Sequence, residues 1–436
     1  MNKTTLQNVP ANTGPLFLAS TFTLVLILIL NNLTFSQNWP QWRGPSDNLV
    51  AEPGDYPIEF SANDNVLWKV QLPGKGGSTP IVWNDHIFVT CGIGDGENAQ
   101  DGVLCYNWSG AELWRVALGK QDPGKHPRGS GSNPSIVTNG DRLFAYYKSG
   151  TLAALDYDGT VIWQTNLQER FGSFSMFFDL GTSPVLADEN VVVAVMHADS
   201  SYLVAFNQES GAISWKYDRN YVCEEENDQA YTTPLVVTEG DRTVLIVWGA
   251  DHLTGHDAGT GQMLWSCGGF NPQNKKYWRV IASPAFSNEI AVVPYGREKH
   301  VAGIKIGGSG DITESARIWE KSDMGTDVAT PVIKDGKVYI VSFKGNVWCL
   351  DVGTGDELWQ STLPRGKGTI YSSPTLSQDK LYICREEGAV YVAQITATGL
   401  QVLTETHFDE KFVATPVLVQ DKILLRGEKY LYCIGK

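Results

Sequence analysis

The sequence predicts an all-β fold made of eight repeats of four short antiparallel strands that close into a ring. Three repeated features support it: a proline before each first strand, a glycine–tryptophan pair at the fourth strand, and a small residue in the third. The prolines lie 42 to 54 residues apart, and strand-built repeats of this length are typical of a β-propeller. They are Pro80, Pro134, Pro184, Pro234, Pro284, Pro331, Pro374 and Pro416.

The second repeat shows the four strands most clearly. We expect them at residues 132–137, 143–147, 151–155 and 161–163, which are short apolar runs rich in β-branched and aromatic residues. Gly, Asn and Asp separate these runs, as is usual for tight turns between strands.

A glycine precedes a tryptophan by four residues in five repeats. Glycine suits a hairpin turn that needs positive φ, and we expect the indole to wedge between neighbouring blades, where its burial contributes about 1.5–3 kcal/mol. Two repeats differ, because Trp319 follows Ser315 and Leu403 takes the last indole position after Gly399. The predicted blade-docking tryptophans are Trp68, Trp114, Trp163, Trp215, Trp265, Trp319 and Trp359.

Every third strand carries a small residue at one aligned position. We expect adjacent blades to approach too closely there for a larger side chain. The column consists of Cys105, Ala154, Ala205, Gly255, Gly303, Cys349, Ala393 and Cys433.

The ends of the chain predict how the ring closes. Residues 66–70 read as an outer strand before the first repeat, whereas the last repeat ends at 431–434 without an outer strand. The N-terminal strand is therefore expected to complete the last blade and cover its open edge. The resulting organisation is a signal peptide at 1–36, a lead-in at 37–65 and an eight-bladed propeller at 66–436.

The N-terminus predicts export. Residues 4–42 carry no charge, and 16–30 form an apolar block that fits a secretory signal better than a full membrane span. We expect cleavage near Ser36 and a periplasmic or secreted protein, with an uncleaved N-terminal anchor as the alternative. The first cysteine is Cys91, so no lipid anchor is predicted.

The charge and the cysteine content of the chain limit which partners and cross-links we expect. The net charge of −14 argues against nucleic acid, which requires concentrated positive charge. The seven cysteines predict no disulfide framework, because three of them fall in the small-residue column of different blades. We expect a monomer.

Two segments resemble the repeat of pyrroloquinoline-quinone-type (PQQ-like) propellers: 154–163 (ALDYDGTVIW) and 349–359 (CLDVGTGDELW). The opening segment 38–45 (NWPQWRGP) is similar to the lead-in of a group of exported bacterial propellers in that superfamily. The resemblance covers roughly residues 38–436 and brings two kinds of relative.

The first relatives, the quinoprotein alcohol dehydrogenases, hold the quinone over calcium, between a tryptophan and a disulfide of adjacent cysteines. No two cysteines are adjacent in this chain. The second relative, the propeller lipoprotein of the outer-membrane barrel-assembly machinery, is a scaffold without catalysis.

Propellers bind ligands at the channel mouth, through loops joining outer to inner strands and second to third strands. The second-to-third connections carry a basic residue or histidine in most repeats, which predicts a cationic collar for an anionic ligand or an acidic partner. The alternative is that these side chains only cap solvated turns. The candidate ligand-binding residues are Lys148, His197, Arg297, Lys344, Arg385 and Arg426.

The long outer-to-inner loops carry aromatic residues that either form a partner- or carbohydrate-binding rim or pack the loops down. They are Phe171, Phe174, Phe177, Phe178, Tyr221, Tyr277 and Trp278.

No catalytic set and no metal site emerge from the sequence. His252 and His256 lie four apart in a strand, where that spacing does not pair ligands. We therefore expect a non-catalytic binding or assembly scaffold of the cell envelope, with no cofactor and an envelope protein as partner. The alternatives are a quinone- and calcium-dependent dehydrogenase of alcohols or sugars, and a carbohydrate-binding propeller.

Overall fold

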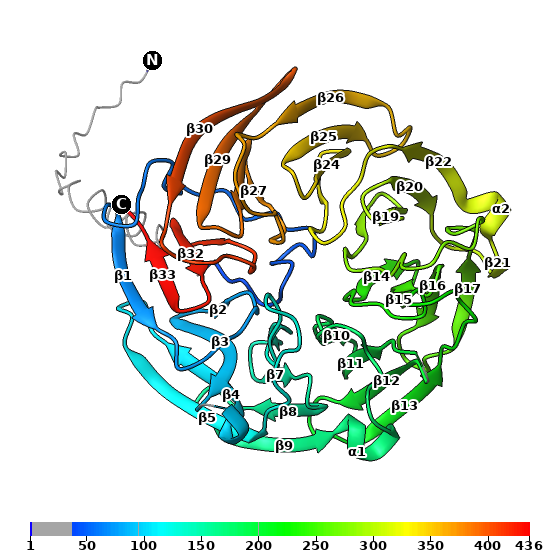
Figure 1. Cartoon of the computed structure of the whole chain (residues 1–436), viewed down its shortest axis with the longest axis horizontal. Coiled ribbons are helices and arrows are strands. Elements are labelled where there is room, and N and C mark those ends of the chain that lie inside the picture. The colour runs from blue at the N-terminus through cyan, green and yellow to red at the C-terminus, as the bar shows by residue number, and fades with distance from the viewer. Residues whose placement is uncertain (2–36, 95, 199) are drawn as a thin grey trace. The chain divides into compact units, whose positions relative to one another are not determined.

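Eight β-sheets are arranged radially around one axis, in the order in which the chain makes them (Figure 1). The computed structural model describes residues 1, 37–94, 96–198 and 200–436. The predicted signal peptide falls, apart from Met1, outside the described residues. Residues 37–436 form one unit, and the predicted eight-bladed, all-β propeller is confirmed.

Blades 1 to 4 are given from the inner to the outer strand. Blade 1 contains β2 (Ile81–Trp83), β3 (His86–Ile93), β4 (Gln100–Tyr106) and β5 (Glu112–Lys120). Blade 2 contains β6 (Val137–Thr138), β7 (Leu143–Tyr146), β8 (Thr151–Leu155) and β9 (Val161–Asn166). Blade 3 contains β10 (Val185–Ala187), β11 (Asn190–Val195), β12 (Tyr202–Asn207) and β13 (Ile213–Asp218). Blade 4 contains β14 (Leu235–Glu239), β15 (Arg242–Gly249), β16 (His252–Asp257) and β17 (Met263–Cys267).

Blades 5 to 8 follow the same order. Blade 5 contains β18 (Ala285–Ser287), β19 (Ile290–Tyr295), β20 (His300–Lys305) and β22 (Arg317–Ser322). Blade 6 contains β23 (Val332–Lys334), β24 (Lys337–Val341), β25 (Asn346–Asp351) and β26 (Glu357–Thr362). Blade 7 contains β27 (Thr375–Ser377), β28 (Lys380–Cys384), β29 (Ala389–Thr396) and β30 (Gly399–His407). Blade 8 contains β31 (Val417–Val419), β32 (Lys422–Arg426), β33 (Tyr430–Ile434) and β1 (Val66–Gln71).

The loops contain three short helical elements. They are the 3-10 turn η1 (Gly96–Asn98), α1 (Leu167–Phe171) and α2 (Thr313–Ala316). An insertion in blade 5 also supplies β21 (Gly310–Asp311), which pairs in parallel with β17 and gives blade 4 a fifth strand. No helix within the described ranges is long and apolar enough to span a membrane.

The first strand closes the ring as predicted. β1 pairs antiparallel with β33, and Trp68 lies opposite Cys433. The start and the end of the propeller therefore share one sheet, in which β1 covers the edge of β33 that would otherwise be unpaired.

The tryptophans link the blades at the outer rim. Five indole Nε1 atoms donate to a backbone carbonyl of the next blade at 2.8 to 3.0 Å. Each of these rings also packs on the turn glycine of that next blade, where a Cβ would come within 2.3 to 2.9 Å of the indole. The pairs are Trp68/Gly110, Trp114/Gly159, Trp163/Gly211, Trp215/Gly261 and Trp319/Gly355.

Within one repeat, the tryptophan therefore contacts the next blade, whereas the glycine contacts the tryptophan of the preceding blade. Trp265 and Trp359 face blades 5 and 7, where the fourth-strand turn departs from the pattern at Ser315 and Gly399. Neither indole makes this bond within the described part of the chain, and the Trp265 side chain instead lies beside Glu239, whose pKa is raised by burial and lowered in part by this indole. In blade 7 the residue paired with Ala393 is Val402, so the predicted place of Leu403 is wrong by one residue. The reason is that Gly399 is already paired with Thr396 and does not occupy the turn position of the other glycines.

The residues of the small-residue column are fully buried. They are small for a different reason from the expected close approach of adjacent blades. Seven of the eight members of the column pair across the sheet with the indole of their own blade, as Cys105 does with Trp114 and Gly303 with Trp319, whereas Ala393 pairs with Val402. A Cβ on Gly303 would lie 2.2 Å from the ring of Trp319. The column is therefore small because the indole folds back over the third strand.

A second set of cross-blade bonds lies at the inner rim. Two residues before every inner strand stands a serine or threonine. In blades 1 to 6 its backbone N–H donates to the hydroxyl oxygen of its counterpart in the next blade. Six consecutive links of this kind, at 2.9 to 3.0 Å, join blades 1 to 7. We call this set the hydroxyl ring: Thr79, Ser135, Ser183, Thr233, Ser283, Thr330, Ser373 and Thr415.

The hydroxyl residues keep a more constant position in the repeats than the prolines do. Seven prolines directly precede an inner strand, whereas Pro134 lies one residue before Ser135 and Ile136 takes the usual proline position. The hydroxyl, and not the proline, is therefore the feature common to all eight blades.

The lead-in 37–65 runs across the centre of the ring, seen as the dark-blue segment in Figure 1. Trp39 pairs with Val82 in blade 1. The fully buried Arg43 donates through Nη2 to the carbonyls of Thr233 and Pro234 in blade 4, at 2.9 Å each. Further along, Leu49 O accepts from Leu376 N in blade 7 at 2.9 Å. The lead-in is thus tied to inner strands on several sides of the ring.

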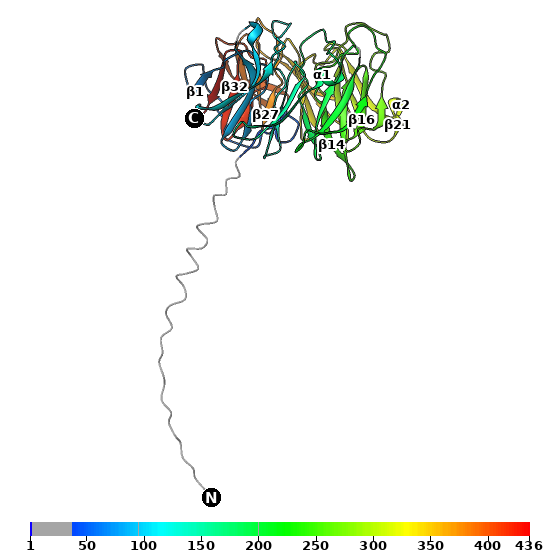
Figure 2. The ribbon, with the colours of Figure 1, turned by 90° about the horizontal axis from the view of Figure 1, so that it is seen from below.

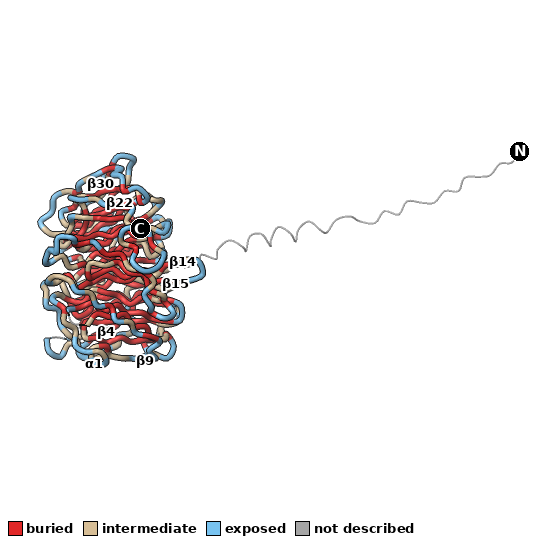
Figure 3. Tube along the Cα trace, turned by 90° about the vertical axis from the view of Figure 1, so that its right-hand side faces the viewer, coloured by how far each residue is buried: buried red, intermediate tan, exposed pale blue. Residues whose placement is uncertain are grey.

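Burial follows the blades. Seen edge-on, strands fill the body of the ring and loops lie at its two faces (Figure 2). The buried residues lie along the strands, and the exposed ones gather in the loops (Figure 3). All seven cysteines are free.

The small-residue column yields a stability prediction. Cys349→Phe should lower the free energy of unfolding by about 1–3 kcal/mol or more, because Cys349 is fully buried opposite Trp359. Cys349→Ala is the matched control and should cost less, since blades 2, 3 and 7 carry alanine there. Thermal unfolding measures both, and an unchanged midpoint for the phenylalanine variant would refute the packing argument.

Candidate functional site

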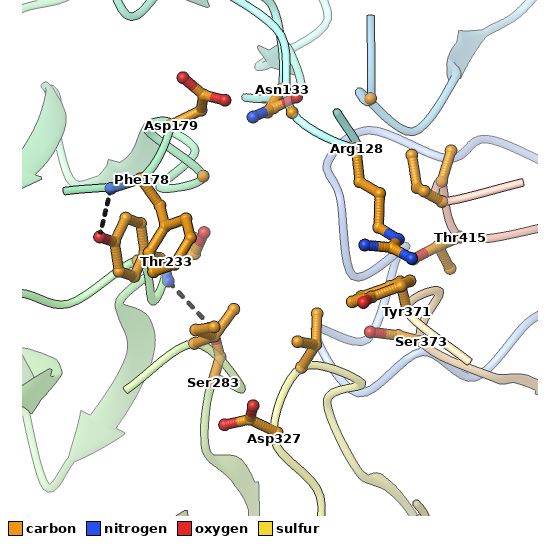
Figure 4. Close-up of a pocket in the computed structure, with 18 of the residues that line it drawn as sticks. Arg128, Asn133, Phe178, Asp179, Thr233, Ser283, Asp327, Tyr371, Ser373 and Thr415 are labelled. Carbon is orange, nitrogen blue, oxygen red and sulfur yellow. Dashed lines mark hydrogen bonds between the residues drawn. The ribbon is translucent and has the colours of Figure 1, made fainter. Parts of the chain in front are cut away.

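The main pocket lies on the propeller axis and has a volume of about 430 Å³, within the range of small-ligand sites. Figure 4 shows its walls, with Arg128 and Tyr371 on one side and Phe178 and Asp179 on the other. Outer-to-inner loops and inner-strand starts from several blades contribute to it, as do two residues of second-to-third loops, Arg297 and Phe343.

The inner part of the pocket is lined by hydroxyls and one indole. Seven members of the hydroxyl ring, all except Thr330, line the pocket. Trp42 from the lead-in joins them, and its Nε1 donates to Thr415 Oγ1 at 3.2 Å. The cross-blade bonds that hold the blades together therefore also place polar oxygens inside the pocket.

Arg128 forms one wall. Its Nε donates to Glu386 Oε1 at 2.5 Å, and the resulting ion pair raises the pKa of Arg128. Its Cζ lies 5.2 Å from the centroid of the Tyr371 ring, which in turn packs against Phe343 at 5.3 Å. The guanidinium is thus fixed by a carboxylate 258 positions away in the chain and by an aromatic face.

The opposite wall is aromatic. Phe178 is fixed by its backbone N–H, which donates to Tyr231 Oη at 3.1 Å. The Arg279 guanidinium lies over the Phe178 ring at 4.3 Å and donates through Nη1 to Glu226 at 2.6 Å. Burial raises the pKa of Tyr231 to about 12, so its hydroxyl stays protonated at neutral pH.

A third arginine completes the charged lining. Arg297 Nε donates to both carboxylate oxygens of Asp327, at 2.9 and 3.1 Å. Burial raises the pKa of Asp327, whereas the nearby Arg297 charge lowers it. The pair is bonded within the site.

Asp179 holds the loop that carries Arg128. Its carboxylate accepts from the backbone N–H groups of Lys125 and His126, at 2.8 to 3.0 Å. Lys148 Nζ lies 3.0 Å from Asp179 Oδ1 and neutralises it from behind. Gly129 allows this close approach, because a Cβ there would lie 2.0 Å from Asp179 Oδ2.

The six residues predicted for a cationic collar do not come together. Only Arg297 lines the pocket, and Lys344 is exposed outside it. Lys148 is buried and bonded to Asp179 and to the carbonyl of Pro123. His197 is buried, with its ring 5.9 Å from that of Phe174.

The two remaining residues of the predicted collar are buried and hydrogen-bond to backbone carbonyls of neighbouring segments. Arg385 donates to the carbonyls of Pro364 and Gly368, at 3.1 Å each. Arg426 donates to the carbonyls of Ser78 and Thr90, at 3.0 and 2.7 Å, and burial lowers its pKa to about 10. A ligand-binding role for these two residues stays a prediction.

Sequence reasoning missed Arg128 and Arg279. Both lie in outer-to-inner loops, where the sequence drew attention to aromatic residues instead. For Arg279 the signal is an arginine directly after two aromatic residues, Tyr277-Trp278-Arg279. The loop of Arg128 contains no Phe, Tyr or Trp, so the sequence offers no such signal there. Among the aromatics singled out from these loops, Phe178 is the one that lines the pocket.

The lining does not match the site expected for a quinone held over calcium. Within the described ranges no group of three or more His, Cys, Asp or Glu side chains is placed to hold a metal ion. The two lining carboxylates, Asp179 and Asp327, are each bonded to a cationic side chain. No two cysteines are adjacent to form the expected disulfide. No step through these groups follows from the site.

The fold and the pocket define a closed eight-bladed propeller with a polar, arginine-lined axial site. The chain belongs to the family described as outer membrane protein assembly factor BamB, whose sequence profile matches residues 99–265, 227–396 and 345–433. BamB of Yersinia pestis is 22% identical over 335 residues, which are 73% of this chain and 75% of that protein. BamB of Salmonella typhimurium is 24% identical over 323 residues, 70% of this chain and 74% of that protein.

Solved structures of both expected kinds of relative share the fold of this chain. BamB from Moraxella catarrhalis has a TM-score of 0.58 at 13% identity, covering 85% of this chain and 99% of that one. A europium-containing methanol dehydrogenase has a TM-score of 0.65 at 9% identity, covering 92% and 98%. At these identities the likeness concerns the fold alone.

A buried carboxyl group beside the Lys148 loop gives a pH prediction. Asp101 is fully buried on β4 and accepts a hydrogen bond from Ser149 Oγ. Burial raises the pKa of Asp101 to about 7, above its unfolded value of about 3.9. Because the folded protein holds this proton more tightly, the free energy of unfolding should fall as the pH rises from about 4 to about 7.

Asp101→Asn stays uncharged and should lack that fall. The free energy of unfolding of the variant should equal that of the parent near pH 4. Near pH 8 it should be higher by on the order of a few kcal/mol, since one pKa unit is worth about 1.4 kcal/mol. Urea unfolding across this range measures the difference. Identical pH profiles for the two proteins would contradict a buried, titrating Asp101.

Proposed function

We propose that this protein is an exported, non-catalytic scaffold that binds a partner of the cell envelope at its axial pocket. Membership of the BamB family supports an assembly role in the outer membrane, and the N-terminal apolar block supports export to the periplasm. We infer a cleaved signal peptide and a propeller that acts as a single module.

The observation that carries the proposal is the state of the charged side chains in the pocket. Arg128, Arg279 and Arg297 are each paired with a carboxylate, and Asp179 is held by Lys148 and two backbone amides. General acid–base catalysis needs a group whose proton can move to or from the substrate. Side chains fixed in ion pairs instead suit recognition, because they offer oriented, permanently charged groups.

The rival function is a quinone-dependent dehydrogenase. It draws support from the shared fold, but the residues that would hold the quinone and calcium are not evident in the lining. Family membership and the bonded lining therefore both favour the scaffold.

One experiment separates the two functions. The purified chain is incubated with calcium and pyrroloquinoline quinone, passed through gel filtration and assayed for dye reduction with alcohols and sugars. We expect no retained quinone absorbance and no turnover. We also expect the chain to be recovered with outer-membrane assembly proteins from detergent-solubilised envelopes of its source cells. Retained quinone with turnover would overturn the proposal.

A further inference from the structure

We propose that the axial pocket binds a carboxylate group, gripped by Arg128 and the hydroxyl ring, whose attached apolar or aromatic group rests on Phe178. This inference rests on the proposed function, since it names what the binding pocket recognises. Four observations on the described residues carry it.

The first is the unused fork of Arg128. Among the described residues its side chain hydrogen-bonds through Nε alone, to Glu386, so neither terminal nitrogen has a protein acceptor. The side chain is 38% exposed and lines the pocket. A guanidinium clamped at Nε with its other N–H groups free is oriented to grip a second carboxylate.

The second observation is the direction of the ion pairs. In the Arg128–Glu386 and Arg279–Glu226 pairs, the guanidinium lines the pocket and the carboxylate does not. The positive end of each pair therefore faces the cavity. Arg279 is held in this place by its bond to Glu226 and by the Phe178 ring beneath its guanidinium.

The third observation is the hydrogen-bonding state of the ring hydroxyls. Ser135, Ser183, Thr233, Ser283 and Ser373 each accept a backbone N–H through the side-chain oxygen. A hydroxyl carries one donor hydrogen as well, and these five side chains make no other hydrogen bond within the described residues. Their hydrogens are therefore available to an acceptor in the pocket, and a carboxylate supplies only acceptors.

The fourth observation is the apolar wall. Phe178 lies across the pocket from Arg128 (Figure 4), and it packs edge-on against Tyr231 with ring centroids 6.3 Å apart. The ring of Phe177, which packs against that of Phe178 with centroids 4.8 Å apart, is 61% exposed although it is a large hydrophobic residue. A ligand that carries an apolar group beside its carboxylate would cover these rings.

Such a group has two sources, a free small carboxylate or the chain terminus of a protein. Titration calorimetry of the full chain with 3-phenylpropionate represents the first source. A short peptide ending in phenylalanine with a free carboxylate represents the second. 3-Phenylpropionamide and the same peptide as its C-terminal amide are the uncharged controls.

We expect at least one acid to bind more tightly than its amide by about 10-fold to 100-fold, as for a hydrogen bond to a charged group. Binding of the peptide acid alone assigns the pocket to a protein terminus, and binding of phenylpropionate assigns it to free carboxylates as well. Equal affinity of acids and amides, or no binding of any probe, would overturn the inference.

Variants locate the site. Arg128→Gln should lose about 10-fold or more of the affinity for the acid. Arg128→Lys should weaken binding while keeping the charge beside Glu386, because lysine lacks the fork. Arg115→Gln is the matched control: Arg115 is also paired with a glutamate, Glu112, but lies on the outer strand β5 away from the pocket. It should bind like the parent.

Unchanged affinity in both Arg128 variants would exclude this site. Failure here is distinguishable from failure of the scaffold function. A chain that still associates with envelope assembly proteins, but binds no carboxylate, refutes this inference and leaves the proposed function standing. Quinone retention with turnover refutes the function.

Discussion

The structure depends on the bond from a backbone N–H in one blade to a hydroxyl oxygen in the next. The donor belongs to the residue two positions before each inner strand, a point where the sheet ladder has not yet begun. In seven blades the following residue is a proline, which has no N–H and favours an extended conformation in the residue before it. A serine or threonine from the next blade supplies the missing acceptor. Repeated around the axis, this bond fixes the spacing of the inner strands.

The outer rim uses a second bond of the same kind. An indole donates to a carbonyl of the next blade and covers a glycine whose φ lies between +67° and +85°. The inner bonds join blades 1 to 7 in succession, and the outer bonds join blade 8 to blade 1, blades 1 to 4 in succession and blade 5 to blade 6. β1 closes the circle by joining the last sheet. The inner bonds also position the lining of the pocket, because the hydroxyls that join the blades are among the groups that line it.

The fold could be predicted from the sequence because its determinants recur within short distances. A glycine and a tryptophan four residues apart reveal a turn and its following strand without any long-range information. The same proximity misled the reasoning behind the small-residue column, since the sequence does not tell whether an indole covers its own blade or the next one. Both happen here: Trp319 covers Gly303 in its own blade and Gly355 in the following one.

The site could be predicted only in outline. The pocket is lined by loops of the kind expected, but of the six predicted ligand-binding residues only Arg297 is among those lining it. Arg128 owes its orientation to Glu386, and nothing in either local sequence links them. Conversely, Arg385 directly follows β28 and Arg426 is the last residue of β32, where an arginine is usually solvated, yet both are buried against backbone carbonyls. Burial of a residue at a strand end depends on the approach of neighbouring loops, which is a property of the closed ring.

Hydrogen exchange of the inner-rim amides tests the central claim most directly. The N–H groups of Ser135, Ser183, Thr233, Ser283 and Thr330 should exchange as slowly as the core strands, through global unfolding, because each is held by a hydroxyl of the next blade. Exchange at the rate of exposed loop amides would show that these bonds do not hold the blades, and would contradict the account.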